Sequence, residues 1–413
     1  MSGPLDGIRV LELAQGLSGP YADMLLGDAG ARVVKVEPIG GDYVRTYGPP
    51  RVGTESAQFL EINRNKRGIA LDIERPEARA ILEDLLREID VLVTDLGPTR
   101  AAELGLDYAN VERVNKRVVH CNITPFGEHG PMKDQPGSEL VIQAMAEFHG
   151  SLGRIDEAPL RLGTDVANIN TGQQAVHGIV AALLMRDRTD EGQFVDVNML
   201  RTLMHMRGMA WTIMSEQADA FGGPHRPNHI IPNGANAVHF KPPEHGVRTK
   251  DGYVLLQGRG STEETYQELL TELGIYDEVK DDPRWGRAGA DVLGPSSAYG
   301  WQVKDTWNRA LADKSTEETV EFFESRGLSA FPVNTYEMLF ADPQVREIKM
   351  VQELTHPTAG TYRTLGSPWL FEDTPAAIQC PAPLLGQHTD EVLGELGITA
   401  AEIARLRSSS IVA

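Results

Sequence analysis

The residues best suited to chemistry lie where a polar segment enters an apolar helical run. The segment contains Asp165, Asn168 and Thr171, which carry a carboxylate, an amide and a hydroxyl group. Apolar residues then recur every three or four positions from Val176 to Leu184, which predicts one buried face of a helix. A polar loop at the start of such a helix can present a reactive side chain beside the free N–H groups of the first turn. The same pattern also fits an ordinary capped helix, so residue types alone leave both interpretations open.

The sequence also predicts what holds this segment in place. Arg186 and Arg188 put positive charge near the expected end of the helix, where the helix dipole is negative. Residues 190–192 are typical of a turn, and the alternating run over residues 193–197 predicts a strand. We therefore expect the polar segment to be anchored by a long helix that leads into a strand.

A strand–helix–strand unit is predicted at the start of the chain. Apolar runs over residues 8–13 and 31–37 predict strands, with a turn and a helix between them. Such a unit implies parallel strands joined by a right-handed crossover. Residues 77–88 have helical spacing, and residues 91–93 form another apolar strand. The glycines of the first turn do not follow the G-x-G-x-x-G spacing, which argues against a dinucleotide site.

Composition limits the class of protein. The chain has 413 residues, 41% hydrophobic and 24% charged, which is typical of a soluble globular enzyme with two domains. Its net charge of −20 argues against nucleic acid or an anionic membrane as a partner. Cys121 and Cys380 are the only cysteines, so neither a disulfide framework nor a zinc site is expected. We see no signal peptide and no membrane-spanning run, and we expect a cytoplasmic protein.

The stretch around Thr171-Gly172 resembles the signature of the class III coenzyme A transferases. This is the family of formyl-CoA transferase, carnitine CoA-transferase and alpha-methylacyl-CoA racemase. Members carry D-x-x-T-G, then a helix, then G-x-G-Q-x-V-D-V. The alignment on Thr171-Gly172 puts the family's catalytic Asp at position 168, where this sequence has Asn168. Asp165 is the nearest other carboxylate.

The resemblance extends over essentially the whole chain. Residues 37–42 match the family's E-P-x-G-G-D turn, and residues 381–397 match its closing motif. It implies an α/β fold in which a large Rossmann-like domain with a parallel sheet is joined to a smaller α+β domain, in an interlocked dimer. The implied divisions are residues 1–200 for the large CoA-binding domain, 201–224 for a linker, 225–330 for the small domain and 331–413 for the return to the large domain.

The resemblance also implies where CoA binds. Lys66 and Arg67 offer cations for its phosphates, or else form a solvated basic turn. Glu103 stands where the family usually has Arg or Lys, and it would repel a pyrophosphate by about 1 kcal/mol or more. The expected CoA-binding residues are Leu71, Asp72, Asp95, Leu96, Gly97, Ser138 and Glu139.

Two further kinds of site are disfavoured. The segment from residue 221 to 250 is rich in Pro, Gly, Asn and His, and carries only Asn233-Gly234 where formyl-CoA transferases have a run of glycines. Its histidines fit no standard metal spacing, so no metal is expected. In the racemase branch a His-Asp pair abstracts a proton at the position where this chain has Ser138-Glu139. Ser138 cannot act as a base in place of the His, so epimerisation is disfavoured. The histidines of residues 221–250 that fit no metal-ligand spacing are His225, His229, His239 and His245.

In this family a carboxylate attacks an acyl-CoA thioester, forms a mixed anhydride and then becomes an aspartyl-CoA thioester. The amide of Asn168 is a poor nucleophile. We therefore expect a transferase subunit that lacks the catalytic Asp and pairs with an active paralogue, similar to the two-subunit succinyl-CoA:benzylsuccinate CoA-transferase. The pair would move CoA from an acyl-CoA such as succinyl-CoA to a carboxylic acid, with the thioester as substrate and no permanently bound cofactor.

Three alternatives remain open at this point. Asn168 is an engineered replacement of Asp in an ordinary homodimeric transferase, or Asp165 is the nucleophile of such an enzyme. The third is a CoA-dependent lyase or racemase-like enzyme that forms no aspartyl thioester.

Overall fold

The computed structural model describes residues 3–53, 55–149, 158, 160–206, 246–257, 262–282 and 300–413. The chain forms two compact units. The first comprises Met1–Glu147, Leu162–Gly208 and Pro343–Ala413, and the second comprises Phe148–Arg161 and Met209–Asp342. The domain boundaries expected from the sequence stay predictions, because most of the expected linker and part of the expected small domain lie outside the described residues.

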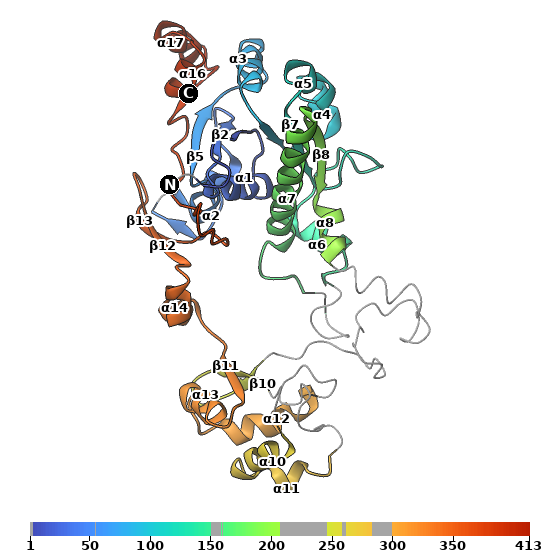
Figure 1. Cartoon of the computed structure of the whole chain (residues 1–413), viewed down its shortest axis with the longest axis vertical. Coiled ribbons are helices and arrows are strands. Elements are labelled where there is room, and N and C mark those ends of the chain that lie inside the picture. Colours follow the sequence, from blue (N-terminus) through green and yellow to red (C-terminus); the bar gives the residue numbers. More distant parts are fainter. Residues whose placement is uncertain are drawn as a thin grey trace. The chain divides into compact units, whose positions relative to one another are not determined.

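A six-stranded parallel sheet forms the first unit's core (Figure 1). This confirms the α/β fold with a parallel sheet. In spatial order the strands are β5 (Lys66–Ala70), β2 (Arg32–Glu37), β1 (Arg9–Glu12), β6 (Val91–Thr94), β7 (Val119–Thr124) and β8 (Gln193–Asn198). The chain winds one way from β1 to β5 and the other way from β6 to β8. The winding therefore reverses between β1 and β6, the kind of position where ligands bind in open α/β sheets.

Alternating side chains of the strands build an apolar core on each face of the sheet. Leu11 and Val34 belong to one core, whereas Val10 and Val33 belong to the other. Helices α3 (Pro76–Arg87), α16 (Thr389–Glu395) and α17 (Ala400–Ser408) contribute to the first core, and α1 (Ser18–Asp28) and α7 (Val166–Thr189) to the second. Burial on both faces explains why consecutive residues of a strand are apolar at Val33-Val34 and at residues 91–93.

The predicted helix and strand of the candidate stretch are confirmed by α7 and β8. However, α7 begins at Val166, so Asn168 and Thr171, expected in a polar loop before the helix, lie within its first turns. Smaller elements complete the first unit, including two antiparallel hairpins. These elements are the 3-10 helix η1 (Tyr43–Thr46), β3 (Arg51–Val52), β4 (Glu55–Ser56), α2 (Ala57–Ile62), α4 (Pro98–Leu104), α5 (Tyr108–Val114), α6 (Glu139–Met145), α8 (Met199–Met206), α15 (Pro343–Glu347), β12 (Val351–His356) and β13 (Gly360–Leu365).

The second unit combines a small antiparallel sheet with helices. Its core contains Leu269, Trp307 and Phe323. The strands, in spatial order, are β11 (Ser329–Pro332), β10 (Tyr253–Gln257) and β9 (Val247–Arg248). The helices are α10 (Glu263–Glu272), α11 (Tyr276–Val279), α12 (Gly300–Leu311), α13 (Thr316–Glu324) and α14 (Tyr336–Ala341). In the part of the chain that the structure describes, no helix is both long and apolar enough to span a bilayer.

Candidate active site

The start of α7 lies directly against the start of α1. A Cβ atom on Gly172 would lie 2.7 Å from the backbone oxygen of Ser18 and 2.9 Å from Cδ1 of Tyr21. Only a residue without a side chain fits this approach, which accounts for the glycine of the Thr171-Gly172 pair. The contact brings the hydroxyl of Ser18, at the first residue of α1, to the first turn of α7.

Asn168 lies in that first turn, and both ends of its amide are hydrogen-bonded. Ser18 Oγ donates to Asn168 Oδ1 over 2.8 Å. Asn168 Nδ2 donates to Glu139 Oε2 over 2.8 Å. The side chain at the family's nucleophile position is therefore held between a hydroxyl and a carboxylate.

Glu139, the first residue of α6, caps α7. Its carboxylate accepts the backbone N–H of Ala167 at 2.8 Å and that of Asn168 at 2.9 Å, and the side-chain amide of Gln143 at 2.7 Å. Asp165, the residue before α7, makes no side-chain cap. A carboxylate at a helix start is favoured by the free N–H groups and the helix dipole. Glu139 thus fixes both the backbone and the side chain of Asn168.

Asp165 lies before the first helical residue and is half-buried. Gln58 Nε2 donates to its Oδ2 over 3.2 Å. Asp165 is thus one turn before Asn168 and its carboxylate has a different set of neighbours.

The predicted CoA residues Asp95, Leu96 and Gly97 follow β6 at the carboxyl edge of the sheet. Asp95 Oδ2 accepts the backbone N–H of Gln15 at 2.9 Å, which ties this loop to the loop after β1. Burial raises the pKa of Asp95 to about 6, against hydrogen bonds that lower it. Asn122, which the sequence analysis missed, donates to the backbone oxygen of Leu96 at 2.8 Å. These contacts fix the loop at the point where the strand order reverses.

The other predicted CoA residues are placed differently. Leu71 is 1% exposed and belongs to the apolar core, so its side chain cannot contact a ligand in this conformation. The half-buried Asp72 donates its backbone N–H to the oxygen of Ile411 at 2.9 Å, so the C-terminal segment covers this loop. Ser138 is exposed and directly precedes α6. The structure thus joins Glu139 to Asn168, but Leu71 offers little to a ligand.

Lys66 and Glu103 have partners within the protein. Lys66 is fully buried and pairs with Glu12 at 2.7 Å, while donating to the backbone oxygen of Pro20 at 2.8 Å. Both interpretations of Lys66 from the sequence, a phosphate ligand and a solvated turn, are therefore wrong. The exposed Glu103 pairs with Arg100 at 2.8 Å, which offsets part of its negative charge.

A buried ion pair that the sequence analysis did not identify supports the loop after β1. Lys35 Nζ lies 2.8 Å from Glu12 and 3.0 Å from Asp42, and donates to the oxygen of Ala14. Asp42 accepts the backbone N–H of Gly16 at 3.2 Å. Burial alone would lower the pKa of Lys35, but the carboxylates of Glu12 and Asp42 raise it above its usual value, so it stays charged. The match of residues 37–42 to E-P-x-G-G-D was the one feature of the sequence that could have pointed to this ion pair, because Asp42 is the last residue of that motif.

Several residues that the sequence analysis singled out lie outside the described residues. They are Asn233-Gly234 and the histidines at 225, 229, 239 and 245. Within the described ranges, no group of three or more His, Cys, Asp or Glu side chains could hold a metal ion.

The family model described as CoA-transferase family III matches residues 5–389. The chain is 31% identical to succinyl-CoA:glutarate CoA-transferase of Mus musculus, over 99% of this chain and 90% of the relative. It is also 31% identical to formyl-CoA:oxalate CoA-transferase of Streptomyces avermitilis, over 100% of both chains. Among solved structures it is similar to a CAIB/BAIF family protein from Brucella suis, with a TM-score of 0.82 and 28% identity over 96% of this chain and 100% of that one. The chain therefore belongs to CoA-transferase family III, a family of CoA-transferring enzymes, as its resemblance to the class III signature indicated.

Proposed function

We propose that this chain is the subunit of a CoA-transferase that lacks the nucleophile, and that it works with a paralogous subunit that keeps the Asp. The observation that carries the proposal is the amide of Asn168, held between Ser18 and Glu139. An amide cannot form the mixed anhydride that the family's chemistry requires. The amide donates to Glu139 and accepts from Ser18, so both ends of the Asn168 side chain already have hydrogen-bond partners.

The reaction follows from the relatives. The pair of subunits moves CoA from an acyl-CoA, such as succinyl-CoA, to a carboxylic acid acceptor, because the Mus musculus relative is named for succinyl-CoA and glutarate. The CoA thioester is a substrate, and no cofactor stays bound. In this proposal CoA lies along the loop from Asp95 to Gly97 and near Ser138 and Glu139, with Asp72 at the margin.

An exposed apolar surface beside the site supports a partner subunit. Helix α6 exposes Leu140, Val141 and Met145, each by more than 40%. Helix α8 exposes Met204 and Met206, and α6 and α8 are in contact. Clustered apolar side chains on a surface mark interaction sites. The surface begins at the residue after Glu139, so a subunit docked there would lie next to the candidate site in the interlocked dimer.

The test compares this chain with and without its paralogue. The purified chain with succinyl-CoA and a carboxylic acid should transfer no CoA and give no enzyme thioester that hydroxylamine or borohydride can trap. Adding the paralogue should restore transfer, with the thioester on the paralogue only. Transfer by this chain alone would refute the proposal.

One alternative nucleophile has a structural argument. Asp165 is half-buried, with Gln58 donating to it, and lies one turn from Asn168. In the same assay, activity of the unaltered chain that Asp165→Ala abolishes would make the protein an ordinary homodimeric transferase with Asp165 as nucleophile.

A further inference from the structure

Three arginines form a staggered row on neighbouring strands near the amino-terminal ends of β1, β2 and β5, with Arg67 displaced by two residues along the strand from Arg32. Arg9 pairs in register with Arg32, and Val34, two residues beyond Arg32, pairs with Arg67. Because side chains alternate between the faces of a sheet, all three arginines project from the face that α3 and α16 cover. Adjacent strands are about 4.8 Å apart. Like charges directly opposite each other, as in the pair of Arg9 and Arg32, destabilise a sheet unless opposite charges compensate them.

The two outer arginines are compensated and the middle one is not. Arg9 pairs with Glu88 at 2.8 Å, and Arg67 pairs with Glu395 at 2.6 Å. Within the described part of the chain, Arg32 has no ion pair or hydrogen bond from its guanidinium. The guanidinium of Arg32, an exposed residue, is therefore open to an acceptor from solution.

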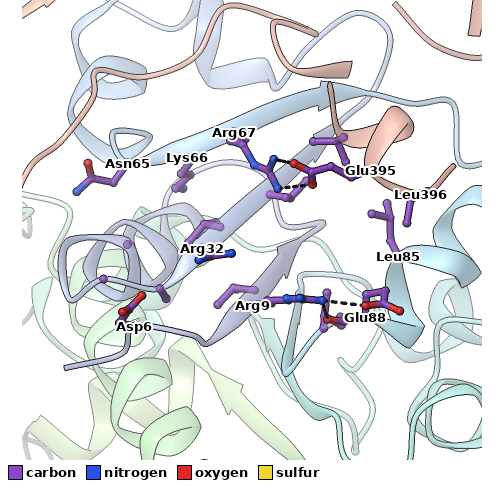
Figure 2. Close-up of a pocket in the computed structure, with 18 of the residues that line it drawn as sticks. Asp6, Arg9, Arg32, Asn65, Lys66, Arg67, Leu85, Glu88, Glu395 and Leu396 are labelled. Carbon is purple, nitrogen blue, oxygen red and sulfur yellow. Dashed lines mark hydrogen bonds and ion pairs between the residues drawn. The ribbon is translucent and has the colours of Figure 1, made fainter. Parts of the chain in front are cut away.

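The three arginines line a cavity of about 1080 Å³. Figure 2 shows Arg9, Arg32 and Arg67 among the side chains around it. Its lining includes the apolar side chains of Val34, Leu85, Val392 and Leu396 as well as the three arginines. The cavity is as large as sites that hold small organic ligands. It thus combines an apolar lining with a guanidinium that lacks an acceptor.

The remaining charged groups around the cavity are paired, with one exception. Lys66 is held by Glu12, and Arg87 by Glu83 and Asp84. Asp6 also lines the cavity and, in the described part of the chain, forms no ion pair. A bound anion would therefore approach Arg32 from the side away from Asp6.

The positive charges of all three guanidinium groups act on the carboxylate of Glu395. The pKa of Glu395 is lowered by its hydrogen bond with Arg67 and, further, by the charges of Arg67, Arg32 and Arg9. An oxyanion in the cavity would meet Arg9 and Arg67 already paired with Glu88 and Glu395, so Arg32 is the arginine of the three left to bind it.

The cavity lies at the amino-terminal ends of the strands. The candidate active site and the loop of Asp95 lie at the carboxyl ends, where ligands of open parallel sheets bind. The cavity is thus on the opposite edge of the sheet, and its occupation does not depend on the proposed function.

We propose that this cavity is a second ligand site, which binds the carboxylate or phosphate group of a small molecule through Arg32. The planar guanidinium donates two parallel hydrogen bonds to either kind of oxyanion. The apolar lining receives the rest of the molecule.

The first test is calorimetric titration of the full-length chain at low ionic strength, without CoA, because the phosphates of CoA would compete for the proposed site. Inorganic phosphate and succinate are titrated separately, so the tighter of the two identifies the preferred oxyanion. Arg32→Gln should weaken that binding about tenfold or more, because it removes a charge-assisted pair. Arg188→Gln, at an exposed arginine that does not line the cavity, should leave it unchanged. Binding of neither anion, or equal binding by Arg32→Gln, overturns the proposal.

The second test is thermal unfolding, which separates a ligand site from a structural arginine. Without added anion, Arg32→Gln should keep or raise the Tm, because it removes repulsion within the row. The preferred oxyanion should raise the Tm of the native chain and not that of the variant. A lower Tm for Arg32→Gln in anion-free buffer would show that Arg32 serves the fold itself, and would overturn the proposal.

Discussion

Replacing Asn168 by Asp should abolish one of the two hydrogen bonds that hold this side chain. The bond from Ser18 survives, because an Asp oxygen also accepts a hydrogen bond. The other bond does not, because Asn168 Nδ2 now donates to Glu139 Oε2 over 2.8 Å and an ionised Asp has nothing to donate. Asn168→Asp therefore brings two carboxylates into contact.

The size of the effect can be worked out from this contact. Two unit charges about 4 Å apart repel by about 4 kcal/mol at an effective dielectric constant of about 20, and partial exposure of both groups reduces this. The lost charge-assisted hydrogen bond adds about 1.5–3 kcal/mol. Uptake of one proton by the carboxyl pair limits the total. We expect the free energy of unfolding to fall by about 2–4 kcal/mol at pH 8.

The pH dependence of this loss has a definite sign. In the folded variant the carboxyl pair has one pKa raised above the value of about 4 in the unfolded chain. A raised pKa destabilises the folded state at pH values above it, and the loss disappears as pH falls and the pair takes up its proton. The deficit of Asn168→Asp should therefore be smaller at pH 5 than at pH 8. For the same reason the new carboxyl should be a poor nucleophile near neutral pH.

Urea unfolding of the native chain and its variants at both pH values measures these differences. Asn168→Ala removes the hydrogen bonds without adding charge, so its deficit should not change with pH. Adding Glu139→Gln to Asn168→Asp should recover part of the stability at pH 8. The argument fails if Asn168→Asp loses the same stability at pH 5 and pH 8, since the contact with Glu139 would then not set the cost.

Two other changes test the surroundings of the site. Gly172→Ala should lower the unfolding free energy by about 1–3 kcal/mol, because its Cβ would lie 2.7 Å from the oxygen of Ser18. Gly163→Ala, where nothing lies within 4 Å of an added Cβ, is the control; equal losses in the two variants would contradict the close packing. Asp95→Asn should reduce the fall in the free energy of unfolding between pH 4 and pH 6 by about 1–3 kcal/mol. Burial raises the folded pKa of Asp95 from 3.8 to about 6, so the native chain loses stability across that window as pH rises. An unchanged slope in urea unfolding would show that Asp95 ionises as easily in the folded chain as in the unfolded one.

The sequence predicted the frame of the first unit because that information is local. Apolar runs such as residues 91–93 mark buried strands, and the spacing from Val176 onward marks the buried face of α7. The family's signature also placed Asn168 at the start of that helix. These features depend only on neighbours within a few residues.

What the sequence did not reveal depends on contacts between distant residues. Glu139 caps a helix that begins 27 positions later. A basic residue such as Lys66 is usually exposed, and its burial depends on Glu12, far from it in the sequence. The row around Arg32 exists only because strand register aligns three separate strands. None of these pairings follows from a local pattern.

The contact between positions 139 and 168 links the fold of this chain to its proposed role. Glu139 caps α7 by accepting two backbone N–H groups as well as the side-chain amide of Asn168. An ionised Asp beside it would have to share a proton or force the two groups apart, and either change disturbs the helix start. Asn168 avoids that conflict by donating where an Asp would repel. The same substitution that removes the nucleophile therefore leaves α6 and α7 joined, as a subunit that supports an active partner requires.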